Sequence, residues 1–190
     1  MNINILEEEN GVLKAELEDA NPAVANTLRR AMISKVPTLS IKEVYINQNE
    51  SGLFDEVLAN RIGQIPFTIP ENVDEEDEVH IAVKQEGPTT VHASDIKADN
   101  EEAEPVNPDT VLVDLKEGQE LTLEGIATLK TGQDHAKHQG GTVGYEKTGE
   151  GEFKFRIEST SGYTNQELLQ EATQQVLKDI ESFKEEIKAY

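Results

Sequence analysis

The stretch NTLRRAMISKVPTLSIKEV, residues 26–44, decides how we interpret this chain. Most of it lies in a window, 21–42, that contains no aspartate or glutamate, although the chain carries 38 acidic residues against 17 basic ones. About four acids would be expected in such a window from the average composition. An acidic protein thus contains one cationic and otherwise apolar segment, and the sequence raises the question of what that segment contacts.

The first half of the window predicts an amphipathic helix. Asn21 suits the N-cap and Pro22 suits the first helical position. Arg29 falls at the edge of the apolar arc, whereas Arg30 falls on the opposite side with Asn26, so the two arginines serve different surfaces. The apolar arc itself consists of Val24, Ala25, Leu28, Ala31, Met32 and Val36.

Two further elements follow directly. The segment TLSIKEVYI, 38–46, predicts a strand, and 51–63 predicts a short helix capped by Ser51 and stopped by Gly63. Arg61 lies in this helix, within a second acid-poor stretch, so three of the four arginines lie in acid-poor stretches. The expected apolar face of the helix is Leu53, Val57, Leu58 and Ile62.

The two chain ends carry the other strong patterns. The first 17 residues alternate as a hairpin, and 152–159 predicts a strand. Thr164 and Glu167 form a capping box that opens a helix from Asn165 to about residue 189. Such a helix spans roughly 37 Å, more than the width of a small domain, so we expect it to lie against something outside its own domain. Its narrow apolar stripe is Leu169, Ala172, Val176, Ile180, Phe183 and Ile187.

The middle of the chain is rich in predicted strands. Alternating or short apolar runs fill 79–130, with acidic loops between them, and the glycine-rich segment 131–151 reads as an irregular loop. We therefore predict an α+β protein of two domains. The chain ends, 1–43 and 150–190, form a dimerisation domain of sheet and long helices, and 44–149 form an inserted β-rich domain.

Composition excludes several functions. The net charge of −21 opposes binding along nucleic acid phosphates, and the absence of cysteine excludes disulfides, thiolate nucleophiles and cysteine-ligated metals. No basic leader is followed by an apolar run, and no apolar segment approaches about 20 residues, so we expect a cytoplasmic protein without a membrane span. Phosphate-binding loops, nucleophile elbows and zinc-hydrolase motifs are absent from the sequence, which argues against an active site of its own.

Alternatives remain open at this point. A metal-dependent hydrolase would use His135, His138 and Asp134, although histidines in a surface loop are the more common explanation of this pattern. A decoy for a basic protein would explain the charge but not the acid-free window. The arginines suit either intramolecular salt bridges or docking against a partner's carboxylates and carbonyls, and composition alone does not separate these readings.

A family resemblance adds to these patterns. NTLRRAMISKVPTLSIKEVYI, FDEVLANRIGQIPFTIP, and the segment from EPVNPDTVLVDL to HAKH resemble the RNA polymerase family that includes the archaeal D subunit, the third-largest eukaryotic subunit and the N-terminal domain of bacterial alpha. The resemblance covers nearly the whole chain. It implies a non-catalytic subunit that pairs with the small subunit L and, with subunits N and P, forms the platform for the two large catalytic subunits.

The resemblance also implies roles for particular residues. Asn26, Arg29, Arg30 and Arg61 would contact the large subunits. Many family members bind an iron–sulfur cluster or zinc in a cysteine-rich insertion, but this chain has only ENVDEEDE there, so we expect no such cofactor. The contacts with the small partner would come from the first and last helices, through Leu28, Met32, Leu169, Val176, Ile180, Phe183 and Ile187.

Overall fold

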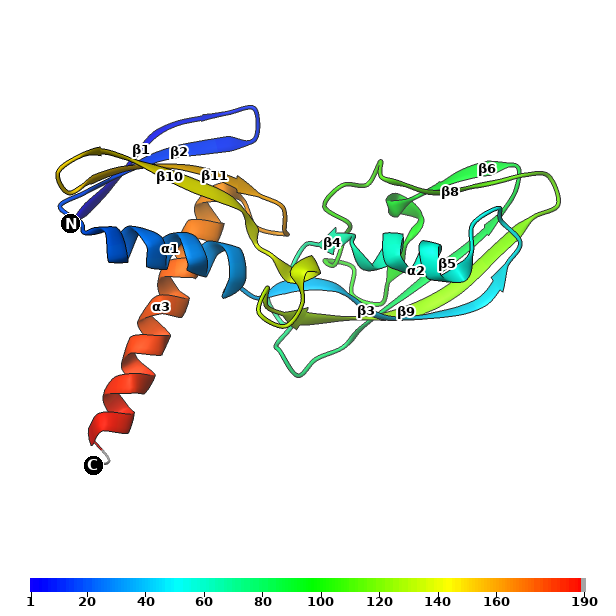
Figure 1. The fold of residues 1–190 in the computed structure, drawn as a ribbon. Helices are drawn as coiled ribbons and strands as arrows, with labels where there is room; N and C mark the ends of the chain where they lie inside the picture. The colour runs from blue at the N-terminus through cyan, green and yellow to red at the C-terminus, as the bar shows by residue number, and fades with distance from the viewer. Residues whose placement is uncertain (189–190) are drawn as a thin grey trace. The chain divides into compact units, whose positions relative to one another are not determined.

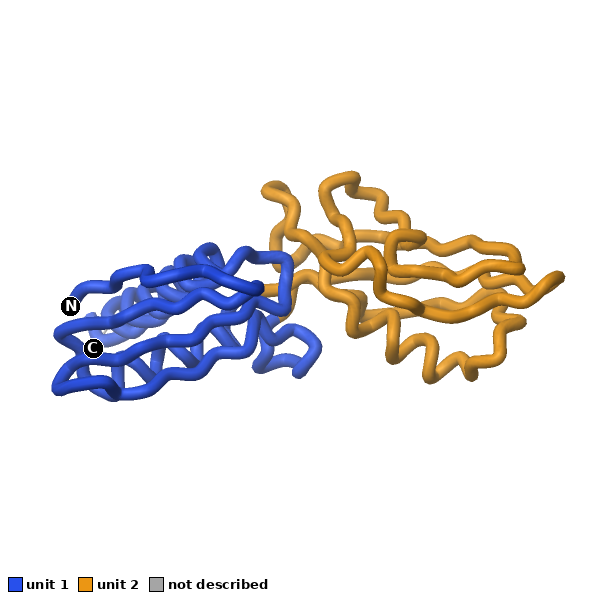
Figure 2. The backbone as a smooth tube through the Cα atoms, turned by 90° about the horizontal axis from the view of Figure 1, so that it is seen from above, with its two compact units in different colours: residues 1–36, 131–190 blue, residues 37–130 orange. Residues whose placement is uncertain are grey.

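The computed structural model describes residues 1–188 and divides the chain into two compact units (Figure 2). Unit 1 consists of 1–36 together with the segment from 131 onward, and unit 2 consists of 37–130. Antiparallel sheets and three α-helices build the two units, which confirms the expected α+β class (Figure 1). Both chain ends belong to one unit, and the other unit is inserted between them.

The boundaries of the units differ from those expected at 43/44 and 149/150. Strand β3, Thr38–Asn49, pairs with strand β9, Glu120–Lys130, from Thr38↔Lys130 to Asn49↔Leu121. This pairing holds the whole of β3 in unit 2. At the other junction, the segment Gly141–Gly149 was expected in the insert. It pairs with a strand of unit 1 and therefore belongs to unit 1. The roles expected for the two domains stay predictions.

Unit 1 contains one four-stranded antiparallel sheet in the order β1-β2-β11-β10. Its strands are β1 Asn2–Glu9, β2 Val12–Glu18, β10 Gly141–Gly149 and β11 Glu152–Ser159. The alternation in β2 and β11 turns Leu13, Ala15, Leu17, Phe153, Phe155 and Ile157 toward one face, where all are buried. Strand β1 is an edge strand and all eight of its residues are exposed.

Two helices cover the apolar face of this sheet, α1 Pro22–Ser34 and α3 Asn165–Lys188 (Figure 1). Asn21 caps α1 as expected, since its side chain accepts a hydrogen bond from the Val24 N–H at 3.0 Å. The helices bury Ala25, Met32, Leu168 and Ala172 in the same core as the strands. Only the first two turns of α3 contribute fully buried side chains.

The segment 131–151 is not the irregular loop that its glycines predicted. It contains a short 3-10 helix, Ala136–His138, and strand β10, which pairs with β11 from Gly141↔Ser159 to Gly149↔Glu152. Val143 is buried and Tyr145 stacks edge-on against Phe153, with ring centres 5.7 Å apart. Tertiary packing therefore overrides the turn propensity of the glycines.

Unit 2 holds a five-stranded antiparallel sheet in the order β4-β3-β9-β5-β7 and a separate pair, β6-β8. The remaining strands are β4 Pro66–Phe67, β5 Val79–Glu86, β6 Thr89–His92, β7 Lys97–Ala98 and β8 Val111–Leu115, and a 3-10 turn covers Ala93–Asp95. Helix α2, Asp55–Gly63, packs on the sheet through Leu58 and Ile62. The strands expected within 79–130 are all present.

Helix α2 differs from its prediction in two respects. It begins at Asp55 with Phe54 in the N-cap position, not with Ser51 as the cap. The Ser51 hydroxyl donates to Asn49 Oδ1 at 2.6 Å and accepts from the Leu53 N–H at 3.2 Å, so it stabilises the preceding turn. Val57, which was expected in the apolar face, is 43% exposed.

Candidate protein-docking surface

The C-terminal half of α3 carries apolar side chains that its own chain does not cover. The capping box opens the helix as predicted, because the Thr164 N–H donates to Glu167 Oε2 at 2.8 Å and the Glu167 N–H donates to Thr164 Oγ1 at 3.2 Å. The first two turns of α3 then carry its buried residues, Asn165, Leu168, Leu169 and Ala172. Beyond Val176 the apolar stripe continues into solvent, with Ile180, Phe183 and Ile187 exposed by 57%, 63% and 57%.

A groove of about 770 Å³ adjoins this stripe within unit 1. It lies between the edge strand β1, the first two turns of α1 and the part of α3 from Gln166 to Ile180. Although 29% of the chain is charged, no residue that lines the groove has a charged side chain. Its apolar walls include Ile3, Ile5, Val24, Leu28, Leu177 and Ile180, and its polar walls include Thr27, Gln166, Gln170, Thr173 and Gln174.

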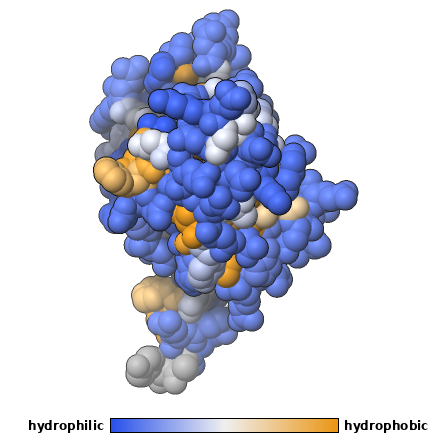
Figure 3. Space-filling view, turned by 90° about the vertical axis from the view of Figure 1, so that its right-hand side faces the viewer, coloured by the Kyte–Doolittle hydropathy of each residue, from blue (hydrophilic) through white to orange (hydrophobic). Residues whose placement is uncertain are grey.

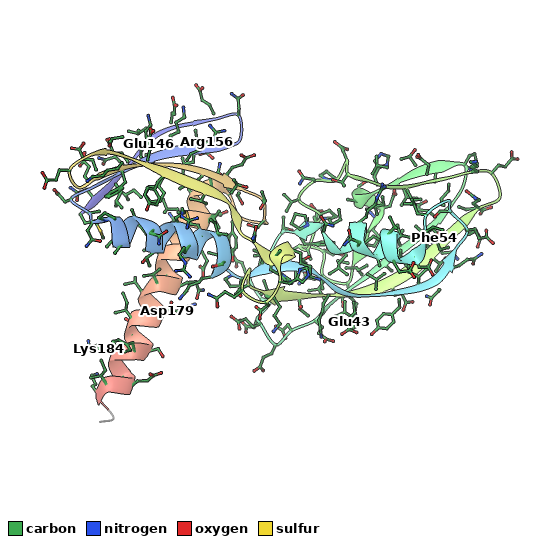
Figure 4. All side chains as sticks on the ribbon, in the orientation of Figure 1. Glu43, Phe54, Glu146, Arg156, Asp179 and Lys184 are labelled. Atoms are coloured by element: carbon green, nitrogen blue, oxygen red, sulfur yellow. The ribbon has the colours of Figure 1, made fainter. Side chains whose placement is uncertain are left out.

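An ion pair joins the two helices beside this surface. The Lys35 ammonium, just past the end of α1, contacts the Asp179 carboxylate on α3. Figure 4 labels Asp179 and, farther along the helix, Lys184. Because the pair is half exposed, it adds little to stability, and it lies near the point where α3 leaves the body of unit 1.

The structure gathers most of the residues predicted to contact the small partner. Leu28, Leu169, Val176 and Ile180 line the groove, and Phe183 and Ile187 continue it along α3. Met32 is the exception. Its side chain is completely buried in the core of unit 1, so it offers no surface to a partner.

Sequence reasoning missed part of the groove. Ile3, Ile5 and Leu177 line it although none was predicted there. The alternating Ile3 and Ile5 were visible in the sequence, but nothing local indicates that β1 is an edge strand with one apolar face left over. Leu177 lies off the narrow stripe but also lines the groove. In Figure 1, α3 crosses α1 at an angle.

The candidate arginine site is divided between the two units. Asn26 and Arg29 lie together on α1, where Asn26 Oδ1 accepts from Arg29 Nε at 3.3 Å and from Nη2 at 3.1 Å. Arg30 is exposed on the same helix. Arg61 belongs to unit 2, where its Nη1 donates to the Leu112 carbonyl at 2.9 Å. No described ion pair involves any of these arginines, so their charges are not used in intramolecular salt bridges within residues 1–188.

The histidine loop does not assemble the alternative metal site. Asp134 Oδ2 accepts from the Thr131 N–H at 2.9 Å, His135 Nδ1 accepts from the Lys137 N–H at 3.2 Å, and His138 is buried. Among residues 1–188, no group of three or more histidine, cysteine or acidic side chains is placed to hold a metal ion. No helix in the described part of the chain is long and apolar enough to cross a membrane.

Two side chains near the start of α3 have shifted pKa values. The hydrogen bonds from the N–H and hydroxyl of Thr164 hold the pKa of Glu167 below its usual 4.5. Burial raises the pKa of the Tyr163 phenol well above its usual value, and the nearby carboxylates of Glu171 and Glu167 raise it further. Glu167 supports the helix start through the capping box, Tyr163 packs against the core of unit 1, and neither residue lines the groove.

Comparison with known proteins gives the family. The model of the RNA polymerase Rpb3/RpoA insert domain matches 44–145, more than half of the chain. The chain belongs to the Rpb3/RpoA family of RNA polymerase subunits. The match covers most of unit 2 and continues into β10 of unit 1, close to the segment that the sequence predicted as the insert.

Relatives of this Rpb3/RpoA family member are named DNA-directed RNA polymerase subunit Rpo3. The chain is 46% identical to that of Natronomonas pharaonis over 125 residues, which are 65% of this chain and 51% of the relative. It is 38% identical to that of Pyrococcus furiosus over 151 residues, 76% of this chain and 58% of the relative. The first relatives are thus matched over little more than half their length. The chain is 35% identical to the subunit of Methanocaldococcus jannaschii over 163 residues, which are 86% of this chain and 84% of the relative.

Proposed function

We propose that this chain is a non-catalytic assembly subunit of DNA-dependent RNA polymerase that works in the cytoplasm. It pairs with the small subunit L through unit 1, and the pair, with subunits N and P, forms the platform for the two large catalytic subunits. The family match and the names of the relatives support the polymerase part of this proposal. The absence of cysteine supports a subunit without the metal centre of its family.

The observation that carries the pairing is the uncovered stripe on α3 together with the uncharged groove beside it. Burying a large apolar side chain such as Ile180 or Phe183 stabilises a complex by about 1.5–3 kcal/mol. A groove without charged side chains in its walls accepts an apolar helix with little cost for burying unpaired charges. Groove and stripe share Ile180, so one partner element can cover both.

The proposed contacts with the large subunits use the arginines. Arg30 is exposed on an acid-free helix, and Arg61 keeps part of its guanidinium free. A guanidinium that is not committed to an intramolecular carboxylate is available for a planar hydrogen-bonded contact with a partner. Their location on separate units would give the platform two points of attachment.

Co-expression with subunit L tests the pairing. We expect a 1:1 heterodimer by gel filtration with light scattering. Two separate, well-folded monomers would contradict the proposal. Recovery of the large polymerase subunits with the tagged chain from its native cell tests the wider assembly, and their absence would count against the platform role.

A double substitution localises the pairing surface. Ile180→Asp with Phe183→Asp should abolish the heterodimer, because burying an unpaired charge costs several kcal/mol. Lys178→Asp with Ser182→Asp is the matched control, since helical spacing puts these residues on the opposite side of α3. Equal loss of pairing in both variants would show that the stripe is not the contact surface.

A further inference from the structure

Helix α2 of unit 2 presents an exposed apolar ridge, and one of its residues, Val57, was expected in the buried face of the helix. Phe54, at the start of the helix and labelled in Figure 4, is 80% exposed. Val57 is 43% exposed. Spacings of three and four residues put Phe54, Val57 and Arg61 in one line along the helix. Figure 3 faces unit 2 and shows a mainly hydrophilic surface interrupted by a few apolar patches, so exposed apolar residues stand out on this unit.

Arg61 is fixed in place at the end of this ridge. Its Nη1 donates to the carbonyl of Leu112 on β8 at 2.9 Å, and no described residue bonds its Nε or Nη2. These two groups form the side edge of the guanidinium, which binds a carboxylate with two parallel hydrogen bonds. The bond to Leu112 tethers one end of the guanidinium to β8 and leaves this edge toward solvent.

The charge of unit 2 makes this guanidinium distinctive. Unit 2 carries 21 acidic side chains and six basic ones, and Arg61 is its one arginine. Asp55 and Glu56 lie on the same helix, yet Arg61 donates to a carbonyl and not to either carboxylate. A partner's carboxylate is repelled by most of this acidic surface and attracted at Arg61.

The neighbouring strand widens the apolar part of the patch. Val111 on β8 is 46% exposed and directly precedes Leu112, whose carbonyl holds Arg61. Single exposed apolar residues are common on proteins and need no explanation. Here three of them accompany an arginine whose guanidinium is hydrogen-bonded to the adjoining strand, and aromatic residues and arginine are enriched in protein interfaces.

The loop that carries Phe54 is rigid as well. Asn49 Nδ2 donates to the Leu53 carbonyl at 2.9 Å and to Asp55 Oδ1 at 2.7 Å, and Asn49 Oδ1 accepts from the Ser51 N–H at 3.1 Å. These bonds fix the residues on both sides of Phe54. The loop backbone is thus ordered before binding, and an aromatic side chain has only two torsions to order when it binds.

We propose that Phe54, Val57, Arg61 and Val111 form a docking surface for a segment of a neighbouring polymerase subunit that presents a carboxylate between apolar side chains. The identity of the partner as a polymerase subunit rests on the proposed function, whereas the chemistry of the contact rests on unit 2 alone. The carboxylate binds the free edge of Arg61, and the apolar side chains cover Phe54, Val57 and Val111.

Site-specific photo-crosslinking tests this surface. The full chain, with p-benzoylphenylalanine at position 57, is produced in its native cell and irradiated, and the adduct is mapped by mass spectrometry. We expect one dominant adduct with a large polymerase subunit, within a segment that contains an aspartate or glutamate beside apolar residues. Arg61→Gln and Phe54→Ser should each lower the adduct yield about tenfold. Arg61→Lys should restore only part of it, because an ammonium cannot form the two parallel bonds.

Tyr45→Ser provides the matched control, because Tyr45 is a second aromatic residue of unit 2 that is 51% exposed, and its hydroxyl donates to Glu43. It should leave the adduct yield unchanged. Assembled polymerase that contains the chain but gives no adduct at position 57, an adduct with a second copy of the chain, or an adduct insensitive to Arg61→Gln would overturn the inference. An acid-bearing adduct in a protein outside the polymerase would instead overturn the proposed function and leave the chemistry of the contact standing.

Discussion

Asn165 joins three separate segments of unit 1 at the start of α3. Its Nδ2 donates to Glu8 Oε1 at 2.9 Å and to the Gly11 carbonyl at 3.1 Å, and its Oδ1 accepts from the Ser159 N–H at 2.7 Å. Asn165→Leu leaves these partners unsatisfied at a site that is 6% exposed, so we expect the free energy of unfolding to fall by about 2–3 kcal/mol. Urea denaturation measures this loss. Gln166→Leu at the neighbouring exposed position should change it by less than about 0.5 kcal/mol.

Gly141 in β10 shows why a glycine-rich segment can be a strand. A Cβ at this position would lie 2.5 Å from the Glu158 carbonyl oxygen and 2.8 Å from a methyl carbon of Leu168. Gly141→Ala should therefore lower the free energy of unfolding by about 1–3 kcal/mol through overpacking. Gly144 lies in the same strand with no atom within 4 Å of such a Cβ, so Gly144→Ala should be neutral or slightly stabilising. Equal effects of the two substitutions in thermal denaturation would contradict this explanation.

At the scale of elements, the capping box gives α3 a pH-dependent start. The folded-state pKa of Glu167 is lowered, so its contribution is complete above about pH 4.5 and is lost as the pH falls through the folded-state value. Glu167→Ala should cost about 0.5 kcal/mol at pH 7, a modest effect because the side chain is largely exposed. In urea denaturation, the stability difference between Glu167→Ala and the unsubstituted chain should narrow as the pH falls below about 4.5.

The elements that the sequence predicted correctly are those whose signals are local. The Asn21 cap, the capping box and the alternation of Phe153, Phe155 and Ile157 each depend on residues a few positions apart. The errors arise where distant segments decide the outcome. Strand β10 forms because it can pair with the edge of β11 that β2 does not occupy. Glycine is needed at position 141 because Leu168 leaves no room there for a Cβ.

The candidate docking surface was predictable to a similar extent. Helical periodicity gave the stripe on α3, but the sequence could not show that the body of unit 1 ends near Asp179 and leaves Ile180, Phe183 and Ile187 uncovered. Figure 3 shows apolar atoms on the last turns of α3. Val57 was misplaced for the related reason that apolar spacing alone cannot tell a core face from a docking face.

At the scale of the whole molecule, the first and last residues of unit 2 lie close together, so the chain enters and leaves this unit at nearly the same place. Thr38 begins β3, Lys130 ends β9, and the two residues face each other in the pairing of these strands. Their Cα atoms are therefore about 5 Å apart. Unit 2 has its own hydrophobic core, separate from that of unit 1. Evolution could insert or enlarge such a unit without opening the fold that receives it.

This geometry predicts that unit 1 folds without its insert. When 37–130 is replaced by a Gly-Ser turn of about four residues, the chain ends at 36 and 131 can be joined without strain. We expect a cooperative thermal transition and, with subunit L, a 1:1 heterodimer by gel filtration, because the groove and the stripe of α3 belong wholly to unit 1. The same shortened chain with Ile180→Asp should fold equally well but remain unpaired. A shortened chain that folds yet fails to bind L, while the intact chain binds, would show that unit 2 takes part in the pairing.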